Sequence, residues 1–266
     1  MDYISLGRYG IEFKHLISGP APVGRVLNYV KLAGQAQLFH KNGQRDLLLT
    51  NNIASAWCSE FMVGLNLVWY DKDAAQPTIL HLTHNGKKLY DLLKDITFKF
   101  DESPNPKVCR TQILRYSPEA YNLFKQIFIE SPIYKNLQIY ILNKGTGSFK
   151  KGRDFYDKYY YHFLEYYGID DDRANPDART STAANRVPSL VQHCLFFKLA
   201  FETENNFNFV LPDVEQTISR EFNVTLNNPT QGDYDSVLEA LNDFEDEVDD
   251  YYRFMFGRCF DDVLEI

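Results

Sequence analysis

The sequence lacks the long apolar run that a membrane-spanning helix requires. No stretch of the 266 residues approaches the roughly 20 consecutive apolar side chains that cross a bilayer. The first fourteen residues, MDYISLGRYGIEFK, carry charges throughout and contain no apolar segment typical of a secretory signal. The two absences predict a soluble cytoplasmic protein without a membrane partner.

Cysteine is scarce and widely spaced. The four cysteines, Cys58, Cys109, Cys194 and Cys259, form no CxxC pair and have no histidine at the spacing of a zinc site. We therefore expect buried thiols in a reducing compartment, and neither a metal site nor a cofactor.

Complete catalytic motifs are also missing. The sequence contains no GxSxG, no GxGxxG and no GxxxxGK[ST]. Glu12-Phe13-Lys14 matches the last part of the Asp…Glu-x-Lys pattern with which nucleases hold Mg²⁺, but only Asp2 precedes it. Whether the protein is an enzyme stays open on this evidence. If it is one, the pattern favours a Mg²⁺-dependent endonuclease with a cryptic active site.

The negative charge is concentrated at the carboxyl end. The formal net charge is −8, yet residues 233–266 contain 12 acidic residues and two arginines, which leaves 24 acidic and 26 basic residues in residues 1–232. This mildly basic body permits a surface that contacts phosphates. Apolar residues at helical spacing among the acidic ones predict an amphipathic helix within residues 229–266. Its apolar stripe packs either on the rest of the chain or on a partner, such as a catalytic or signalling protein subunit.

Hydrophobic periodicity predicts a first unit in residues 1–100. Apolar residues at helical spacing predict a helix within residues 20–39, and Thr50, Asn51 and Asn52 are capping residues for a second helix over about 52–66. A strand, a polar turn and a second strand follow up to Leu82. This is the element order of a winged helix-turn-helix; the alternative is an unrelated small α+β domain.

The sequence LTHNGKKLYDLL, residues 82–93, carries the most specific resemblance. It resembles the Leu-Thr-x-x-Gly-x-x-Leu close of many winged-helix DNA-binding domains. The resemblance implies that Leu82 returns the strand to the core, that Thr83 begins a helix, and that Gly86 permits close packing.

A second unit in residues 101–228 repeats the same order. An offset of 134 residues pairs Phe61 with Leu195 and Leu65 with Leu199. The match fits a duplication, and it also fits two unrelated amphipathic helices, which share apolar spacing. Ser-Pro pairs at 117–118 and 131–132 predict helix starts. We thus expect a mainly helical fold with small β wings: tandem winged helix-turn-helix units followed by a C-terminal amphipathic helix.

Reading of duplex DNA is the main functional hypothesis. In a winged helix the helix before the wing enters the major groove, and short polar or basic side chains hold phosphates. Residues 144–153, KGTGSFKKGR, are expected to form a loop that either tracks a phosphate backbone or is simply soluble. For any single candidate, a helix cap or a solvated helix face is the competing explanation. The candidate DNA-binding residues are Thr50, Asn51, Asn52, Ser55, Ser59, Lys87, Lys150, Lys151, Arg153, Arg179, Thr180, Ser181, Thr182, Asn185, Arg186, Ser189 and Gln192.

With the segment ANRVPSLVQHCLFFKLA added, residues 20–95 and 115–212 resemble the winged-helix DNA-recognition modules of bacterial restriction endonucleases, type IIS enzymes in particular. The resemblance implies sequence- or structure-specific binding of double-stranded DNA by a recognition or accessory component of a restriction or defence system, with the cutting machinery on another chain. The resemblance concerns the architecture only. It does not assign any individual base contact to a residue of this sequence. A transcription regulator and a winged-helix protein-protein scaffold are the alternatives, and the net charge favours the scaffold.

Overall fold

Helices make up most of the described structure, and the strands form small antiparallel sheets, as the sequence predicts. The computed structural model describes residues 5–6, 11–12, 19, 21–39, 47–48, 58–70, 78–96, 117–166 and 182–210. Its helices are α2 (Val23–Gln35), α4 (Cys58–Gly64), α5 (His84–Leu93), α7 (Pro118–Glu130), α8 (Pro132–Lys144), α9 (Arg153–Tyr166) and α10 (Thr182–Phe196). Its strands are β1 (Ser5–Leu6), β2 (Ile11–Glu12), β3 (Leu38–Phe39), β4 (Val68–Trp69), β5 (Ile79–Leu82), β6 (Ser148–Lys150), β7 (Ala200–Glu202) and β8 (Asn206–Phe209).

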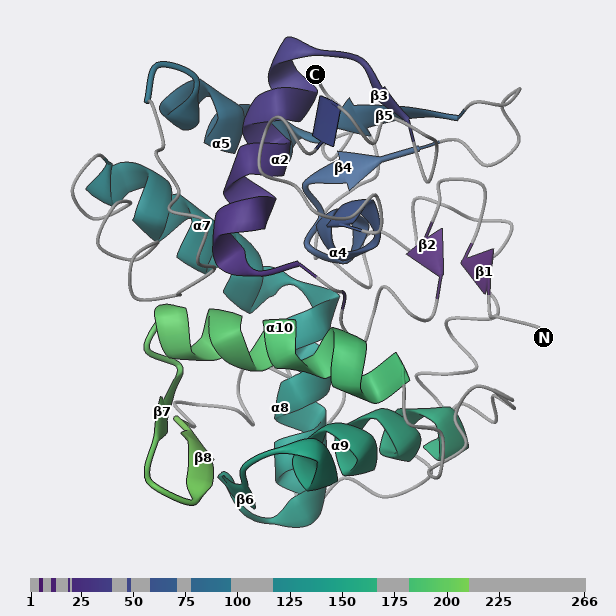
Figure 1. The fold of residues 1–266 in the computed structure, drawn as a ribbon, viewed down its shortest axis with the longest axis vertical. Coiled ribbons are helices and arrows are strands. Elements are labelled where there is room, and N and C mark those ends of the chain that lie inside the picture. Colours follow the sequence, from purple (N-terminus) through teal and green to yellow (C-terminus); the bar gives the residue numbers. More distant parts are fainter. Residues whose placement is uncertain are drawn as a thin grey trace.

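The first unit comprises α2, β3, α4, β4, β5 and α5, in the upper half of Figure 1. Its sheet has the strand order β3-β5-β4, and every pairing is antiparallel. The helix α2 begins directly after Pro22, which suits a helix start because its fixed φ is helical and it lacks an N–H to satisfy. The apolar stripe of α2, which includes Val23, Val26 and Val30, is buried. The unit therefore has a helical layer over one face of a three-stranded sheet.

The segment that closes the first hairpin behaves as the resemblance implies. The Thr83 N–H donates to the Leu67 carbonyl at 3.1 Å, and the Thr83 hydroxyl donates to the Asn66 carbonyl at 2.7 Å. The same hydroxyl accepts from the Gly86 N–H at 3.0 Å and so caps α5. A Cβ atom on Gly86 would lie 2.0 Å from the Leu67 carbonyl oxygen, so only glycine allows α5 to approach this turn.

The second unit comprises α8, β6, α9, α10, β7 and β8, in the lower half of Figure 1, and has one more helix than the first unit between its first strand and its hairpin. Its strand order, β6-β8-β7, again places the last strand between the other two. The predicted Ser-Pro starts are confirmed: the Ser117 and Ser131 hydroxyls accept from Ala120 N–H at 3.0 Å and Tyr134 N–H at 3.3 Å. Each proline lies in the first turn, where no intrahelical N–H is lost.

The turns after α4 and α10 have the same backbone structure. Asn66 and Lys198 have positive φ angles of 54° and 60°. The next residue in each turn donates back five positions, Leu67 to the Met62 carbonyl at 2.9 Å and Leu199 to the Cys194 carbonyl at 2.8 Å. This equivalence sets an offset of 132 residues, so the predicted offset of 134 is wrong by two. Apolar residues at helical spacing are compatible with several offsets between the two segments, whereas the matching turns allow only one.

The segment KGTGSFKKGR is not the loop that its glycines and charges predict. Ser148–Lys150 form β6, an edge strand that pairs with β8. Phe149 lies opposite Phe207, and its ring lies 5.5 Å from that of Tyr140 and 5.2 Å from that of Phe155. The packing of Phe149 on the core of the unit explains why Ser148–Lys150 pair with β8 as a strand.

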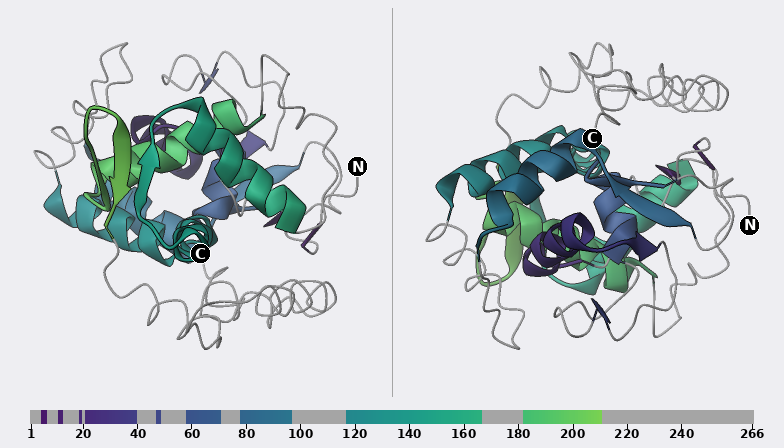
Figure 2. Two further views of the ribbon diagram at one scale, coloured as in Figure 1. Left: turned by 90° about the horizontal axis from the view of Figure 1, so that it is seen from below. Right: turned by 90° about the horizontal axis from the view of Figure 1, so that it is seen from above.

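A single cluster of buried side chains runs through both units. The helix α10 crosses the middle of the molecule, with α2 and α4 on one side and α8 and α9 on the other (Figure 1). The helix α7 packs against α5 of the first unit and α8 of the second, and its Tyr121 hydroxyl donates to the Phe196 carbonyl of α10 at 3.3 Å. Figure 2 shows the same fold from two further sides. The units therefore share one core.

Replacement of Gly86 by alanine tests the close approach of α5 to the first hairpin. Because the added Cβ meets a backbone carbonyl that cannot rotate away, we expect Gly86→Ala to lower the free energy of unfolding by about 1–3 kcal/mol. Urea denaturation followed by circular dichroism measures the change. Lys88→Ala, an exposed change two residues along the same helix, is the matched control and should leave the midpoint unchanged. Equal stability of the two variants would contradict the packing role of Gly86.

Candidate nucleic-acid interface

The helices that precede the two hairpins, α4 and α10, are linked by two side-chain contacts. The carboxylate of Glu60 on α4 is fully buried and accepts a hydrogen bond at 2.6 Å from Arg186 Nη2 on α10, whose side chain is 13% exposed. Beside this ion pair, the rings of Phe61 and His193 meet edge to face with centroids 4.8 Å apart. The contact joins residues more than 120 positions apart in the sequence. An ion pair and an aromatic pair therefore link the first unit to the second.

This arrangement corrects three of the predicted DNA contacts. Ser59 is fully buried and hydrogen-bonded with Tyr29, and Ser189 is only 5% exposed. Arg186 directs its guanidinium to Glu60. In this arrangement none of the three is available to a base edge: Ser59 is held by Tyr29 of α2, Ser189 is buried, and Arg186 is held by Glu60. The sequence places them on a recognition helix, but it does not indicate which face of that helix the other unit covers.

The outward face of α10 retains part of the predicted reading surface. Asn185 is exposed near the amino end of the helix, and Gln192 is half-buried two turns later. Thr182 is the first residue of the helix. The remaining candidates on these two helices, Thr50, Asn51, Asn52, Ser55, Arg179, Thr180 and Ser181, lie outside the described residues.

The basic residues around β6 are largely matched by carboxylates. Lys151 pairs with Glu202 at 2.9 Å, and Arg153 pairs with Asp157 at 3.2 Å. Lys150, in contrast, is exposed on the outer side of the sheet. Surface pairs of this kind contribute little to stability, but they reduce the positive potential that would attract a phosphate backbone.

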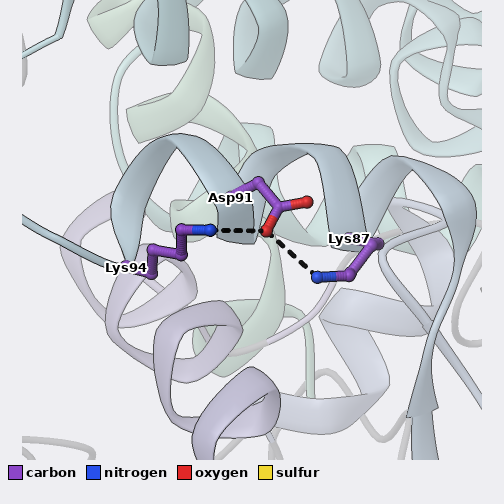
Figure 3. A network of polar contacts seen from close by, with 3 residues as sticks. All are labelled: Lys87, Asp91 and Lys94. Carbon is purple, nitrogen blue, oxygen red and sulfur yellow. Dashed lines mark hydrogen bonds and ion pairs between the residues drawn. The ribbon is translucent and has the colours of Figure 1, made fainter.

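Lys87 belongs to a similar pair of contacts on α5. Asp91 Oδ1 accepts from Lys87 Nζ at 3.0 Å and from Lys94 Nζ at 3.4 Å (Figure 3). The hydrogen bond from Lys87 is the main cause that lowers the pKa of Asp91 below its ordinary value. Lys87 also lies over the Tyr90 ring, 5.1 Å from its centroid. The group carries a net positive charge of one on an exposed helix surface.

His193, one of the polar residues that the sequence places on the predicted recognition helix, is fully buried. Its Nδ1 lies 2.7 Å from the Ser189 carbonyl oxygen, and Phe128 stacks on its ring with centroids 5.4 Å apart. Burial lowers the pKa of His193 to about 4, and the Ser189 contact acts weakly in the opposite direction. The neutral imidazole thus fills an aromatic cage behind the ion pair. Only its helical spacing, on the apolar side of α10, could have marked it as a core residue.

Cys58 and Cys194 are free thiols, and both are buried as predicted. Burial raises the pKa of Cys58 to about 12, so this thiol is unreactive in the folded state. Within the described ranges, no three His, Cys, Asp or Glu side chains come together as they would around a metal ion. Nor does any described helix have the length and apolar character needed to cross a membrane.

Removal of the Glu60 carboxylate tests the helix pair. Because Glu60→Ala leaves the Arg186 guanidinium largely buried without its counter-charge, we expect a loss of about 3 kcal/mol in the free energy of unfolding. The double variant Glu60→Ala/Arg186→Ala should lose less than the sum of the single changes, as measured in a double-mutant cycle. Glu119→Ala, which removes an exposed carboxylate from α7, is the control. Strict additivity would show that the two side chains are not coupled in solution.

The buried imidazole of His193 predicts a pH dependence. Its folded-state pKa of about 4 lies below the ordinary value of 6.5, so the folded state favours the neutral form. The stabilisation is complete above pH 6.5 and is lost as the pH falls toward 4, by up to about 3 kcal/mol. His193→Phe should flatten the dependence of unfolding free energy on pH between 7 and 4.5. Burial is the main cause that also lowers the pKa of His162 to about 4, and the nearby Lys144 acts in the same direction. His162→Gln is therefore the comparison variant. An unchanged slope in His193→Phe would place a charged imidazole in the core and contradict this account.

Comparison of the chain with protein-family models, with curated proteins and with solved structures gives no significant match. The function therefore has to be argued from the geometry of this chain.

Proposed function

We propose that the protein binds double-stranded DNA through two winged-helix units that are joined along their recognition helices. The observation that carries the proposal is the repeated topology. In each unit a helix, a strand, further helical structure (α4 in the first unit, α9 and α10 in the second) and a hairpin follow in order, and the last strand lies between the other two. This is the arrangement in which winged-helix proteins present a helix and a hairpin to the grooves of a duplex.

The surface that we assign to DNA is the outer side of the second unit. Asn185 is exposed at the amino-terminal part of α10, where recognition helices contact base edges, and an amide side chain can bind adenine with two hydrogen bonds. Lys150 and Lys198 are exposed on the sheet and on the turn that precedes the hairpin. The inner faces of α4 and α10 hold the two units together and take no part in DNA binding.

The biological setting that we propose is a restriction or defence system. It rests on the resemblance of the segments around LTHNGKKLYDLL and ANRVPSLVQHCLFFKLA to recognition modules of restriction endonucleases. In this proposal the chain is a recognition or accessory component, and a catalytic or signalling subunit docks on the acidic residues 229–266, which lie outside the described residues.

A protein-protein scaffold is the second candidate. It is favoured by the way in which Lys87, Lys151 and Arg153 pair with carboxylates and Arg186 with Glu60, because each pair removes positive charge that DNA would need. A scaffold would retain the winged-helix core and bind protein through other surfaces.

Fluorescence anisotropy with a labelled random-sequence duplex, at about 50 and 200 mM salt, separates the two candidates. Binding that weakens steeply with salt is expected of phosphate contact. On a preferred sequence selected afterwards, Asn185→Ala should cost about 1–3 kcal/mol, whereas Asn122→Ala, an exposed asparagine on α7, should cost nothing. Arg186→Ala is unsuitable for this test because it also breaks the helix pair. No binding at either salt concentration would sink the DNA proposal and leave the scaffold.

A further inference from the structure

The outer face of the sheet β6-β8-β7 exposes an aromatic ring. Phe201 on β7 is 56% exposed, and Val210, directly after β8, is 40% exposed. These are two of the three large apolar side chains that are exposed in the described part of the chain. Figures 1 and 2 place the β7-β8 hairpin at the periphery of the molecule. A single exposed ring is common on protein surfaces, so the side chains around it decide whether this face is a contact surface.

The side chains that lie across the sheet from Phe201 on this face are polar, and the exposed carboxylates Glu202 and Glu204 follow it along the hairpin. Asn208 lies opposite Phe201 on one side and opposite Ser148 on the other, and Asn206 lies opposite Lys150. The Asn206 amide donates to the Ser148 hydroxyl at 3.0 Å, which orders the middle of the face. Glu202, the nearest carboxylate on β7, is paired with Lys151. The face therefore combines one aromatic ring, two amides and one free-standing positive charge on Lys150.

The first unit indicates how a ring at this position is used. At the offset of 132, Trp69 on β4 is the equivalent of Phe201, and its cross-strand neighbour is His81. The Trp69 and His81 rings stack with centroids 4.6 Å apart and an angle of 22° between their planes. In the second unit the neighbouring strand has Asn208 in place of a ring. Both units thus place an aromatic ring on the same strand position, Trp69 in the first and Phe201 in the second. Only Trp69 has a second ring opposite it on which to stack.

We propose that the outer face of β6-β8-β7 binds unpaired nucleotides of single-stranded DNA, with a base stacked on Phe201 and a phosphate held by Lys150. Every base has a π-face, so an aromatic ring on a sheet binds single strands with little sequence preference. The side-chain oxygen of Asn206, whose amide nitrogen donates to Ser148, can accept from the polar edge of a base. This site is separate from α10, and it does not depend on binding of duplex DNA.

The test uses the full chain and a fluorescently labelled oligothymidylate of about 12 nucleotides, a length that covers one binding face. Phe201→Leu keeps an apolar side chain but removes the ring, and we expect it to weaken binding about tenfold or more. Phe201→Trp keeps the ring and should bind at least as well as the parent protein. Lys150→Ala should weaken binding and make it less dependent on salt.

An abasic oligonucleotide of the same length gives the sharpest control, because it presents the phosphates without the bases. Equal binding of the abasic and thymidine oligonucleotides, or an unchanged affinity in Phe201→Leu, would overturn the proposal. A parent protein that is dimeric by light scattering and becomes monomeric in Phe201→Leu would assign the face to a second copy of the chain, and would also overturn it.

The duplex experiment distinguishes this site from the proposed function. Loss of single-strand binding in Phe201→Leu, with duplex binding unchanged, supports the inference. Binding of the oligonucleotide by a protein that does not bind duplex DNA would refute the proposed function and leave the single-strand site standing. Circular dichroism confirms folding of each variant, and unfolding is not expected, since Phe201 is largely outside the core.

Discussion

The buried ion pair between Glu60 and Arg186 is the constraint on which the arrangement of the two units depends. A carboxylate that is completely removed from water is tolerable only beside a well-placed cation. Movement of α10 away from α4 would therefore leave a bare charge in a mainly apolar setting, next to the cage of Phe61, Phe128 and His193. Hydrophobic packing alone would permit the helices to slide along each other. The Glu60–Arg186 pair stabilises the one position of α10 relative to α4 in which the two charges meet, and other positions are higher in free energy.

This constraint determines which surfaces remain for binding. The helix α10 contacts the first unit through Arg186 and His193, whereas Asn185 on the same helix is exposed. Several basic side chains near the surface are already matched by carboxylates, as Lys87, Lys151 and Arg153 are. The chain therefore offers ligands a limited set of outer helix and sheet positions, and the strength of binding at these positions has to come from shape and stacking as well as from charge.

Local features of the sequence predicted the local structure well. The Ser-Pro pairs and Thr83 with Gly86 begin their helices as expected, because capping depends on a few neighbouring residues. The candidate site was predicted less well. Nothing near Glu60 or Arg186 in the sequence reveals that they meet 126 residues apart. The strand β6 was hidden by its glycines and lysines, since only Phe149 within it reaches the core. Long-range packing decided both.

The contact between Phe61 and His193 has a consequence for the symmetry between the two halves of the chain. With the register set by the turns at Asn66 and Lys198, these two residues occupy the same position in their respective units, and their rings touch. A position that contacts its own equivalent lies on the local axis of an isologous interface, the kind formed by two identical subunits. At this one position the two halves of the chain meet as two identical subunits would. At the position before it the halves differ, because Glu60 in the first half corresponds to Gln192 in the second, so the ion pair with Arg186 has no counterpart related by this symmetry.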